Sequence, residues 1–354
     1  MKNSDAATPV QPDLELALRD KSLFIGNSAG QVKAYTVEEV LSNKLNVWNG
    51  WYCAIGVENL HVSADGNVSG GACRNSGFFG NAYHFIENIP TEWYQCRKPT
   101  CFCGGDMQVR KAKSLSLKEM TYRDPDADSI VDDLKDPAFV APVHQSIHKQ
   151  YPLSISWDLG RRCNYSCSYC PPIVSNKFEA FKTWGSLMYA YEEISRTFLK
   201  NRKSKFTFTG GEPTLNPKYM DFVNFLKDEG HIIHTTTNGS RSAEYFSELI
   251  EKSFIGLSYH LEFAIKDHFE GVLRAIIQKK NIHQEAKNNW CGVRIMVPPN
   301  RFAEAKDLYD SFKGIDGFRD HEIMLSMSPL FEADKTQELI KYSEEELRDI
   351  GRLG

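Results

Sequence analysis

The stretch LSISWDLGRRCNYSCSYC, residues 153–170, indicates how the second half of this chain folds. Its first part, residues 153–159, alternates polar and apolar side chains as a half-buried β-strand does. Its second part spaces Cys163, Cys167 and Cys170 as C-x3-C-x2-C, a pattern expected by chance roughly 0.006 times per chain. Chance is therefore a poor explanation, and three thiols on a loop after a strand predict one metal centre.

Three protein ligands leave one coordination position of that centre open. Structural zinc is normally closed by four protein ligands, whereas a cubane iron–sulfur cluster held by three cysteines keeps one iron accessible. No fourth cysteine or histidine stands beside the triplet. An open cluster therefore fits the spacing better than zinc, which remains the alternative.

After residue 150 the chain alternates strand-like and helix-like segments. Strands are expected at 153–159, 205–210, 231–240, 254–262, 291–297 and 321–328, and helices at 183–199, 218–228, 242–253, 267–280, 302–313 and 335–350. This alternation is typical of βα units around a parallel sheet. We expect an α/β fold in which six units form a partial (β/α)6 barrel of TIM type, with its chemistry at the carboxyl ends of the strands.

A second motif, Gly210-Gly211-Glu212-Pro213, ends the expected second strand just as the cysteine triplet ends the first. Taken alone, this run would be a turn. In this order, the two motifs resemble those of the radical S-adenosylmethionine (AdoMet) enzymes. The resemblance covers about residues 150–350.

The resemblance implies that Cys163, Cys167 and Cys170 are catalytic and hold a [4Fe-4S] cluster whose open iron is chelated by AdoMet. One electron from the reduced cluster would cleave AdoMet to methionine and a 5'-deoxyadenosyl radical, which abstracts a substrate hydrogen. A reducing partner such as a flavodoxin or ferredoxin is then expected.

The resemblance also implies contacts to AdoMet. Tyr169, the aromatic residue before the last cysteine of the triplet, would lie near the adenine. Gly210, Gly211 and Glu212 would receive the methionine amino group, since glycines let carbonyls approach closely and a carboxylate complements an ammonium.

Polar residues at the ends of later strands are further candidates. Asn238 and Ser258 stand where such enzymes contact the ribose and carboxylate of AdoMet; the alternatives are a turn residue and a buried hydroxyl. His260 alternates with Ser258 and is a candidate AdoMet or substrate contact, or else a core histidine. Arg294, on the expected fifth strand, could clamp a carboxylate or phosphate.

The first half of the chain carries five more cysteines, at positions 53, 73, 96, 101 and 103. Residues 61–68 form an expected β-hairpin with an Asp-Gly turn, with Cys53 before it and Cys73 after it. These features favour a second metal site. Structural zinc is the competitor here, because a closed four-cysteine site suits it.

This segment resembles the auxiliary-cluster modules, called SPASM or twitch domains, of some radical AdoMet enzymes. The resemblance implies a second, auxiliary iron–sulfur cluster of the [4Fe-4S] type. We expect its ligands to be Cys53, Cys73, Cys101 and Cys103, with Cys96 as the spare cysteine. The module differs from the family pattern because it precedes the barrel instead of following it.

The expected organisation is a small cysteine-rich α+β (hairpin) domain at 1–120, a linker at 121–149 and the barrel at 150–354. A net charge of -4 gives no broad positive field, so we expect no nucleic-acid partner. No apolar run approaches the roughly 18 residues of a membrane span, and the first residues lack the core of a signal peptide. We therefore expect no membrane partner and a cytoplasmic protein, whose thiols stay reduced.

Our leading hypothesis is a radical AdoMet oxidoreductase whose auxiliary cluster assists oxidation or bond formation on a small polar metabolite. One alternative is a peptide-modifying maturase. Another is an epimerase in which Cys291 donates a hydrogen atom, although a core cysteine is the competing interpretation. From a different class, a non-catalytic zinc-binding or interaction protein remains possible on sequence alone.

Overall fold

The structure is a computed structural model that describes residues 21–87, 89–101, 103–143, 150–170, 175–330 and 342–353. Two compact units divide the chain. Unit 1 comprises Met1–Ala54 and Trp93–Lys149, and unit 2 comprises Ile55–Glu92 and Gln150–Gly354. The sequence suggested one boundary near residue 150. The compact units do not follow it, because residues 55–92 belong to unit 2.

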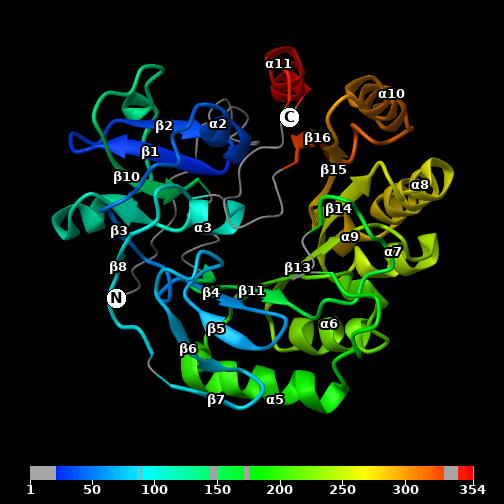
Figure 1. The fold of residues 1–354 in the computed structure, drawn as a ribbon, viewed down its shortest axis with the longest axis horizontal. Helices are drawn as coiled ribbons and strands as arrows, with labels where there is room; N and C mark the ends of the chain where they lie inside the picture. The colour runs from blue at the N-terminus through cyan, green and yellow to red at the C-terminus, as the bar shows by residue number, and fades with distance from the viewer. Residues whose placement is uncertain are drawn as a thin grey trace, which may run out of the picture. The chain divides into compact units, whose positions relative to one another are not determined.

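Unit 2 is built on six parallel strands that neighbour one another in chain order (Figure 1). They are β11 (Ser154–Asp158), β12 (Lys205–Thr209), β13 (Ile232–Thr237), β14 (Phe254–His260), β15 (Cys291–Val297) and β16 (Met324–Pro329). The connections carry α5 (Trp184–Ile194), α6 (Tyr219–Asp228), α7 (Ala243–Leu249), α8 (Lys266–Ile282), α9 (Gln284–Asn288) and α10 (Phe302–Lys313). This alternation confirms the predicted α/β fold.

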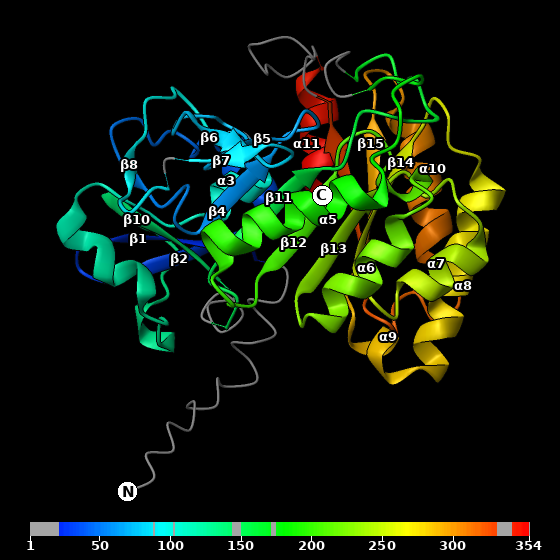
Figure 2. The same cartoon turned by 90° about the horizontal axis from the view of Figure 1, so that it is seen from below.

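The two faces of this sheet differ in chemistry. Figures 1 and 2 show α5, α6, α7, α8 and α10 along one face, and the side chains beneath them are buried. Trp157 on β11 packs edge-on against Phe222 of α6 at a centroid distance of 5.8 Å, and Phe208 meets Tyr219 of α6 at 5.7 Å. Each fully buried aromatic side chain contributes roughly 1.5–3 kcal/mol through area removed from water.

The opposite face, which we call the polar face, carries the alternate residues of the same strands. It includes Ser154, Ser156, Asp158, Lys205, Thr207, Thr209, His234, Thr236, Gly256, Ser258, His260, Gly292, Arg294, Met296, Ser326 and Ser328. Most are partly exposed, whereas their neighbours along each strand are buried. A parallel sheet normally buries apolar residues on both faces, so this polar face is available for binding or chemistry.

The predicted Asp-Gly hairpin is present but does not belong to a separate module. Strand β4 (Asn59–Val62) pairs with β5 (Asn67–Ser69) across Gly66, whose φ of +86° explains the glycine. Strand β4 also pairs in parallel with β11. With β6 (Phe78–Asn81) and β7 (Phe85–Ile86), it extends the parallel sheet to ten strands.

The extension corrects the expectation that residues 1–120 form one domain. Leu60 and Val62 are fully buried on β4 and continue the apolar face beside Ile155 and Trp157. The backbone N–H and C=O groups along the edge of β11 need hydrogen-bond partners. Strand β4 of the buried hairpin supplies them. Local hairpin signals do not reveal which edge a hairpin will meet.

Unit 1 contains a six-stranded antiparallel sheet in the order β2-β1-β10-β9-β3-β8. Its elements are β1 (Leu23–Asn27), β2 (Val32–Tyr35), α2 (Val37–Ser42), β3 (Tyr52–Cys53), β8 (Tyr94–Gln95), α3 (Gly104–Gln108), β9 (Lys111–Ala112) and β10 (Pro137–Pro142). Strand β10 lies inside the predicted linker 121–149, which is therefore only partly a connection. Four apolar residues of β10 are buried between β1 and β9, and the acidic residues before them hid this strand.

The last predicted helix, 335–350, overlaps with α11 in its second half. Helix α11 spans Glu344–Leu353, while residues 335–341 lie outside the described residues. The helix predicted at 183–199 is α5 continued by a π-helical turn at Ser195–Leu199. In the part of the chain that the structure describes, no helix is both long and apolar enough to cross a membrane.

Replacing Leu60 with alanine should destabilise the whole parallel sheet of unit 2. The fully buried leucine would leave a cavity next to β11, at a cost of about 2–5 kcal/mol. We expect urea-induced unfolding of unit 2 to shift to lower urea. Leu115→Ala, at a side chain 53% exposed in unit 1, is the control and should change little. An unshifted transition for Leu60→Ala would contradict the integration of the hairpin.

Candidate active site

The three cysteines of the triplet lie together on the loop that follows β11. All are at least partly buried. Burial raises the pKa of Cys163 and Cys170, and it raises that of Cys167 to about 11. Repulsion from the neighbouring thiolates raises the pKa of Cys163 and Cys167 further. A bound metal would reverse the shift, because it favours thiolates.

Among the described residues, no three His, Cys, Asp or Glu side chains converge closely enough to hold a single metal ion. A cubane cluster does not require that convergence. Each of its three cysteine thiolates binds a different iron, so the sulfur atoms stand around the cluster. The donor set is therefore compatible with a cluster.

Gly210 and Gly211 pack directly against the backbone of the cysteine loop. A Cβ on Gly210, whose φ is +115°, would overlap the Gly160 carbonyl oxygen, and one on Gly211 would overlap the Arg162 carbonyl oxygen. Two backbone hydrogen bonds close this seam: Gly211 N–H to Gly160 O (2.9 Å) and Glu212 N–H to Arg162 O (2.7 Å). Only glycine permits so close an approach at both positions.

Glu212 is 3% exposed, and its carboxylate organises the ends of two strands. Oε1 accepts hydrogen bonds from the Thr214 amide (3.1 Å), the Thr214 hydroxyl (2.6 Å) and the Thr237 hydroxyl (2.8 Å). Oε2 accepts one from the Asn238 amide at 2.6 Å. Burial raises the Glu212 pKa, and these donors oppose the rise. The predicted contact of Glu212 with the methionine amino group of AdoMet stays a prediction.

Asn238 connects this carboxylate to the cysteine loop. Its side-chain Nδ2 lies 3.8 Å from Cys163 Sγ and donates to Asn164 Oδ1 at 2.9 Å. Its Oδ1 accepts from the Ser240 amide at 3.0 Å, in the manner of an Asx turn. The structure therefore confirms the turn at Asn238, and its contact with AdoMet stays a prediction.

His260 reaches the cysteine loop from the carboxyl end of β14. Its Nδ1 shares a 2.8 Å hydrogen bond with the Tyr169 hydroxyl and lies 3.5 Å from Cys167 Sγ. The two rings are stacked at 5.9 Å. Burial lowers the pKa of His260 to about 4, so the imidazole is neutral at pH 7. Burial also raises the pKa of Tyr169.

A carboxylate that the sequence did not single out as a ligand holds the loop in place. Glu262, two residues after the end of β14, accepts from the Ser168 amide at 2.7 Å and from the Ser168 hydroxyl. Tyr165 on the same loop stacks on Phe263 at a centroid distance of 5.5 Å. The cysteine loop is thus tied to both β13 and β14.

Ser258 and Arg294 occupy neighbouring positions on the polar face, as partners in the register of β14 and β15. Arg294 is exposed between buried Val293 and Ile295. The structure therefore places Arg294 on the face away from the helices, as its alternation predicted. The roles of Ser258 and Arg294 stay predictions.

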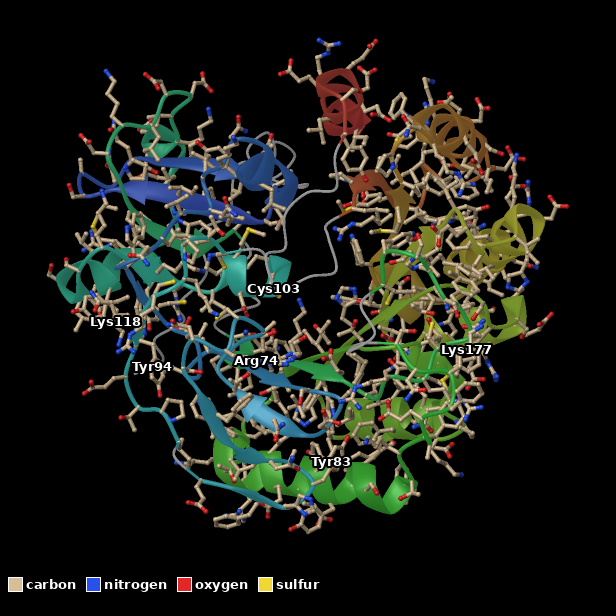
Figure 3. The ribbon with its side chains drawn as sticks, in the orientation of Figure 1. Arg74, Tyr83, Tyr94, Cys103, Lys118 and Lys177 are labelled. Atoms are coloured by element: carbon tan, nitrogen blue, oxygen red, sulfur yellow. The ribbon has the colours of Figure 1, made fainter. Side chains whose placement is uncertain are left out.

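Sequence reasoning missed a charged cluster at the carboxyl end of β11. Asp158 lies 3.5 Å from His61 Nε2 of β4. Burial raises the Asp158 pKa to about 6, and the guanidinium groups of Arg74 and Arg161 oppose that rise. Figure 3 labels Arg74 on the loop after β5, and Arg161 also pairs with Asp65 of the hairpin turn. Only the parallel pairing of β4 with β11 brings these groups together.

Three of the cysteines in unit 1, Cys53, Cys101 and Cys103, are near enough to interact electrostatically. Burial raises the pKa of Cys101 well above its usual value, and repulsion from Cys53 and Cys103 adds to this effect. Lys111 opposes it; this lysine is 1% exposed, and its ammonium group donates to three carbonyls within α3 and its end. Cys103 precedes α3, where Figure 3 labels it.

The remaining cysteines fall elsewhere. Cys96 is partly exposed in unit 1, with its sulfur 4.0 Å from the Lys98 carbonyl oxygen. Cys73 belongs to unit 2, so its predicted place among the ligands of a second cluster stays a prediction. Cys291 is 2% exposed at the start of β15, and burial raises its pKa to about 12. That environment is typical of a core cysteine.

Residues 157–289 match the family model described as Radical SAM superfamily. Bovine molybdenum cofactor biosynthesis protein 1 (Bos taurus) is 30% identical over 132 residues, covering 36% of this chain and 19% of that protein. A GTP 3',8-cyclase from Crocosphaera subtropica is 26% identical over 139 residues, covering 38% of this chain and 39% of that protein. This chain thus spans well under half the length of either relative.

Among solved structures, Streptococcus suis SuiB bound to S-adenosylmethionine aligns with a TM-score of 0.42 and 16% identity. The alignment covers 59% of this chain and 49% of SuiB.

Replacing Asp158 with asparagine should change how stability depends on pH. The folded pKa of about 6 is above the ordinary value of 3.8, so the carboxyl group favours folding at low pH and loses this contribution as pH rises through 6. Between pH 5 and pH 8 the wild type should lose about 1 kcal/mol of unfolding free energy relative to Asp158→Asn. Urea unfolding at the two pH values measures this. Identical pH dependence in both proteins would show that Asp158 titrates normally.

Proposed function

We propose that this chain, a radical SAM enzyme through its domain at residues 157–289, binds a catalytic [4Fe-4S] cluster through Cys163, Cys167 and Cys170. When bound, the reduced cluster supplies the electron that cleaves AdoMet to methionine and a 5'-deoxyadenosyl radical, which abstracts a substrate hydrogen. The observation that carries the proposal is the seam between the cysteine loop and Gly210–Glu212. It holds the two motifs of the resemblance against each other at the carboxyl ends of β11 and β12.

The residues of the cysteine loop fit such a cluster. Hydrogen bonds to cysteine sulfur favour the thiolate, and each of the three sulfurs has one that lowers its pKa, with Tyr169 beside Cys167 and Ser175 beside Cys170. The Tyr165 amide donates to Cys163 Sγ at 3.4 Å, and Asn238 Nδ2 lies 3.8 Å from the same atom. His260 stands beside Cys167. The ties from Glu262 and Asn238 keep the loop in one conformation before any ligand arrives, which lowers the entropic cost of binding.

The same residues are our candidates for AdoMet binding. Tyr169 and His260, stacked beside the triplet, would face the adenine. The strand-end backbone at Gly210 and Gly211, ordered by the buried Glu212, would receive the methionine amino group. Asn238 and Ser258, on later strands, would contact the ribose and the carboxylate, and Arg294 would clamp a carboxylate or phosphate.

The six parallel βα units would form a partial (β/α)6 barrel whose interior is the polar face. In βα barrels the reaction takes place at the carboxyl ends of the strands, and side chains inside the barrel contact what lies there. The partly exposed polar face would then receive the substrate below AdoMet. We propose a small polar metabolite, because the relatives named GTP 3',8-cyclase act, by their name, on a small polar molecule.

We propose that unit 1 holds an auxiliary cluster. The support is the electrostatic coupling of Cys101 to Cys53 and Cys103, with the buried ammonium of Lys111 favouring the thiolate of Cys101. Cys73 is the proposed fourth ligand and Cys96 the spare. An auxiliary cluster would accept an electron from a substrate radical or anchor the substrate, which suits net oxidation or bond formation. A flavodoxin or ferredoxin would reduce the catalytic cluster.

Alanine at position 163, 167 or 170 should abolish release of 5'-deoxyadenosine from AdoMet under dithionite. Each substitution removes one of three thiolates that the cluster needs, so we expect a loss of at least 100-fold, above the roughly 10–100-fold lost when only a residue that supports a metal ligand is removed. Chromatographic quantification of 5'-deoxyadenosine provides the measurement. Cys291→Ala is the control and should retain release; unchanged turnover in this variant also argues against hydrogen donation by Cys291. Wild-type protein that releases none would overturn the proposal.

Iron counting after anaerobic reconstitution tests the second cluster. Two cubanes predict about eight iron atoms per chain, and Cys101→Ala should lower this to about four while 5'-deoxyadenosine release persists. Cys96→Ala should leave the count unchanged, because we propose it as the spare. A wild-type count of about four would leave unit 1 without a cluster, and zinc without iron would support the non-catalytic alternative.

A further inference from the structure

We propose that a basic patch beside the cysteine loop is the docking surface for a small acidic electron-carrier protein. The basic patch consists of Arg162, Lys177, Phe178 and Lys182. The proposal rests on the proposed function, because it concerns the delivery of the electron that cleaves AdoMet. It adds to that function the place where the electron enters and the residues that recognise its carrier.

The segment that carries the basic patch is positively charged in a chain that is negatively charged as a whole. Residues 161–182 hold one carboxylate, at Glu179, and four cations, at Arg161, Arg162, Lys177 and Lys182. The segment therefore has an excess of three positive charges, whereas the whole chain has a net charge of -4. A local positive field of this kind attracts an acidic protein and speeds its encounter.

Two hydrogen bonds hold the tip of this segment against the cysteine loop. The Asn176 amide donates to the Arg161 carbonyl oxygen at 2.7 Å, and the Arg161 amide donates to Glu179 Oε2 at 2.8 Å. Lys177, which Figure 3 labels, lies between Asn176 and Glu179 in the chain. Its backbone is therefore fixed beside the loop that carries the three thiols.

Arg162 connects the same segment to the first cysteine of the triplet. Its guanidinium group lies 4.6 Å from the centre of the Phe181 ring, and its Nη1 donates to the Glu179 carbonyl oxygen at 3.3 Å. Arg162 also directly precedes Cys163. The basic patch thus begins one residue from a proposed cluster ligand, which gives an electron a short path to the cluster.

Two cations of the basic patch are open to an acidic partner. The Glu179 carboxylate lies 3.9 Å from the cationic groups of both Arg161 and Lys182. Within the described ranges, Arg162 and Lys177 form no ion pair with a carboxylate, and both residues are exposed. Their charges would therefore be neutralised by carboxylates of a partner protein.

Phe178 adds an exposed aromatic ring to these cations. It is 92% exposed, more than any other large apolar side chain that the structure describes. Its amide donates to Asn176 Oδ1 at 2.9 Å, so the backbone beneath the ring is held in place. Aromatic residues and arginine are enriched at protein interfaces, and this combination favours a protein as the occupant.

The segment continues toward the helix-covered side of the parallel sheet. The Lys182 carbonyl oxygen accepts from Asn216 Nδ2 at 3.0 Å. Two residues later, Trp184 of α5 meets Phe222 and Phe225 of α6 edge-on, at centroid distances of 6.4 and 6.2 Å. The basic patch is therefore separate from the polar face, and a docked carrier would leave the polar face free for the substrate.

The step at this surface is the transfer of one electron. The reduced flavin or iron–sulfur centre of the carrier loses one electron, and the oxidised cluster gains it, with no bond formed or broken. Such encounters are transient and bury less than about 1,200 Å². A patch of a few exposed side chains is sufficient for an interface of that size.

Two sources of electrons separate docking from catalysis. Release of 5'-deoxyadenosine from AdoMet by the reconstituted full-length protein is measured with dithionite, and with a bacterial flavodoxin or [4Fe-4S] ferredoxin kept reduced by its NADPH-dependent reductase. We expect at least one carrier to drive release. Raising sodium chloride from about 50 to about 300 mM should slow this carrier-driven release at least fivefold, because salt screens the attraction. Dithionite-driven release should change less than twofold.

Lys177→Glu should lower carrier-driven release at least fivefold, because it reverses a charge of the basic patch. Phe178→Ala should lower it as well. Both side chains are exposed, so dithionite-driven release should stay within twofold of the wild type. The matched controls are Lys287→Glu on α9 and Ile282→Ala at the end of α8, also at exposed positions. They should keep both activities.

The docking surface is overturned if Lys177→Glu keeps its carrier-driven release, or if neither carrier drives the wild type while dithionite does. An equal loss with both electron sources would show a structural role and also overturn it. Absence of dithionite-driven release in the wild type counts instead against the proposed function. The two proposals can therefore fail separately.

Discussion

The buried carboxylate of Glu212 is the interaction on which the rest of the site depends. A charged group without exposed surface needs hydrogen-bond donors, and each such bond contributes about 1.5–3 kcal/mol. Its donors come from the turn after β12 and from the end of β13. The backbone amide of Glu212 meanwhile binds the cysteine loop. One residue therefore sets the relative positions of the loop after β11 and the ends of the next two strands.

The two faces of the parallel sheet carry different kinds of side chain: one face is apolar and buried, and the other is polar and partly exposed. Aromatic side chains such as Trp157 and Phe208 bury the helix-covered face and hold the strands rigid. The other face can then carry serines, threonines, histidines and cations without loss of the fold. The cysteine loop stands at the carboxyl end of this polar face, tied by Asn238, His260 and Glu262.

Much of unit 2 could be predicted because its signals are local. The strands and most helices follow from periodicity and lie within a few residues of their predicted bounds, and the motifs at Cys163 and Gly210 depend on short spacings. The roles that needed distant partners were not visible. Glu262 lies at the end of the expected strand 254–262, but its bond to Ser168 appears only when β14 stands beside the cysteine loop. Asp158 likewise has no partner until β4 brings His61. For the same reason, the hairpin was expected in the N-terminal domain and β10 in the linker. The structure places the hairpin in the ten-stranded sheet and β10 in the six-stranded sheet.

The sequence alone determined the two motifs that the structure brings together: three thiols on one short loop, and the glycine pair at Gly210 and Gly211. It also determined the alternation of strands and helices, since backbone and side-chain periodicity act over a few residues. Only the tertiary structure decided that the hairpin completes the edge of β11, and that Glu262 binds Ser168 of the cysteine loop. Strand pairing and side-chain contacts join residues far apart in the chain, and neither leaves a mark in local sequence.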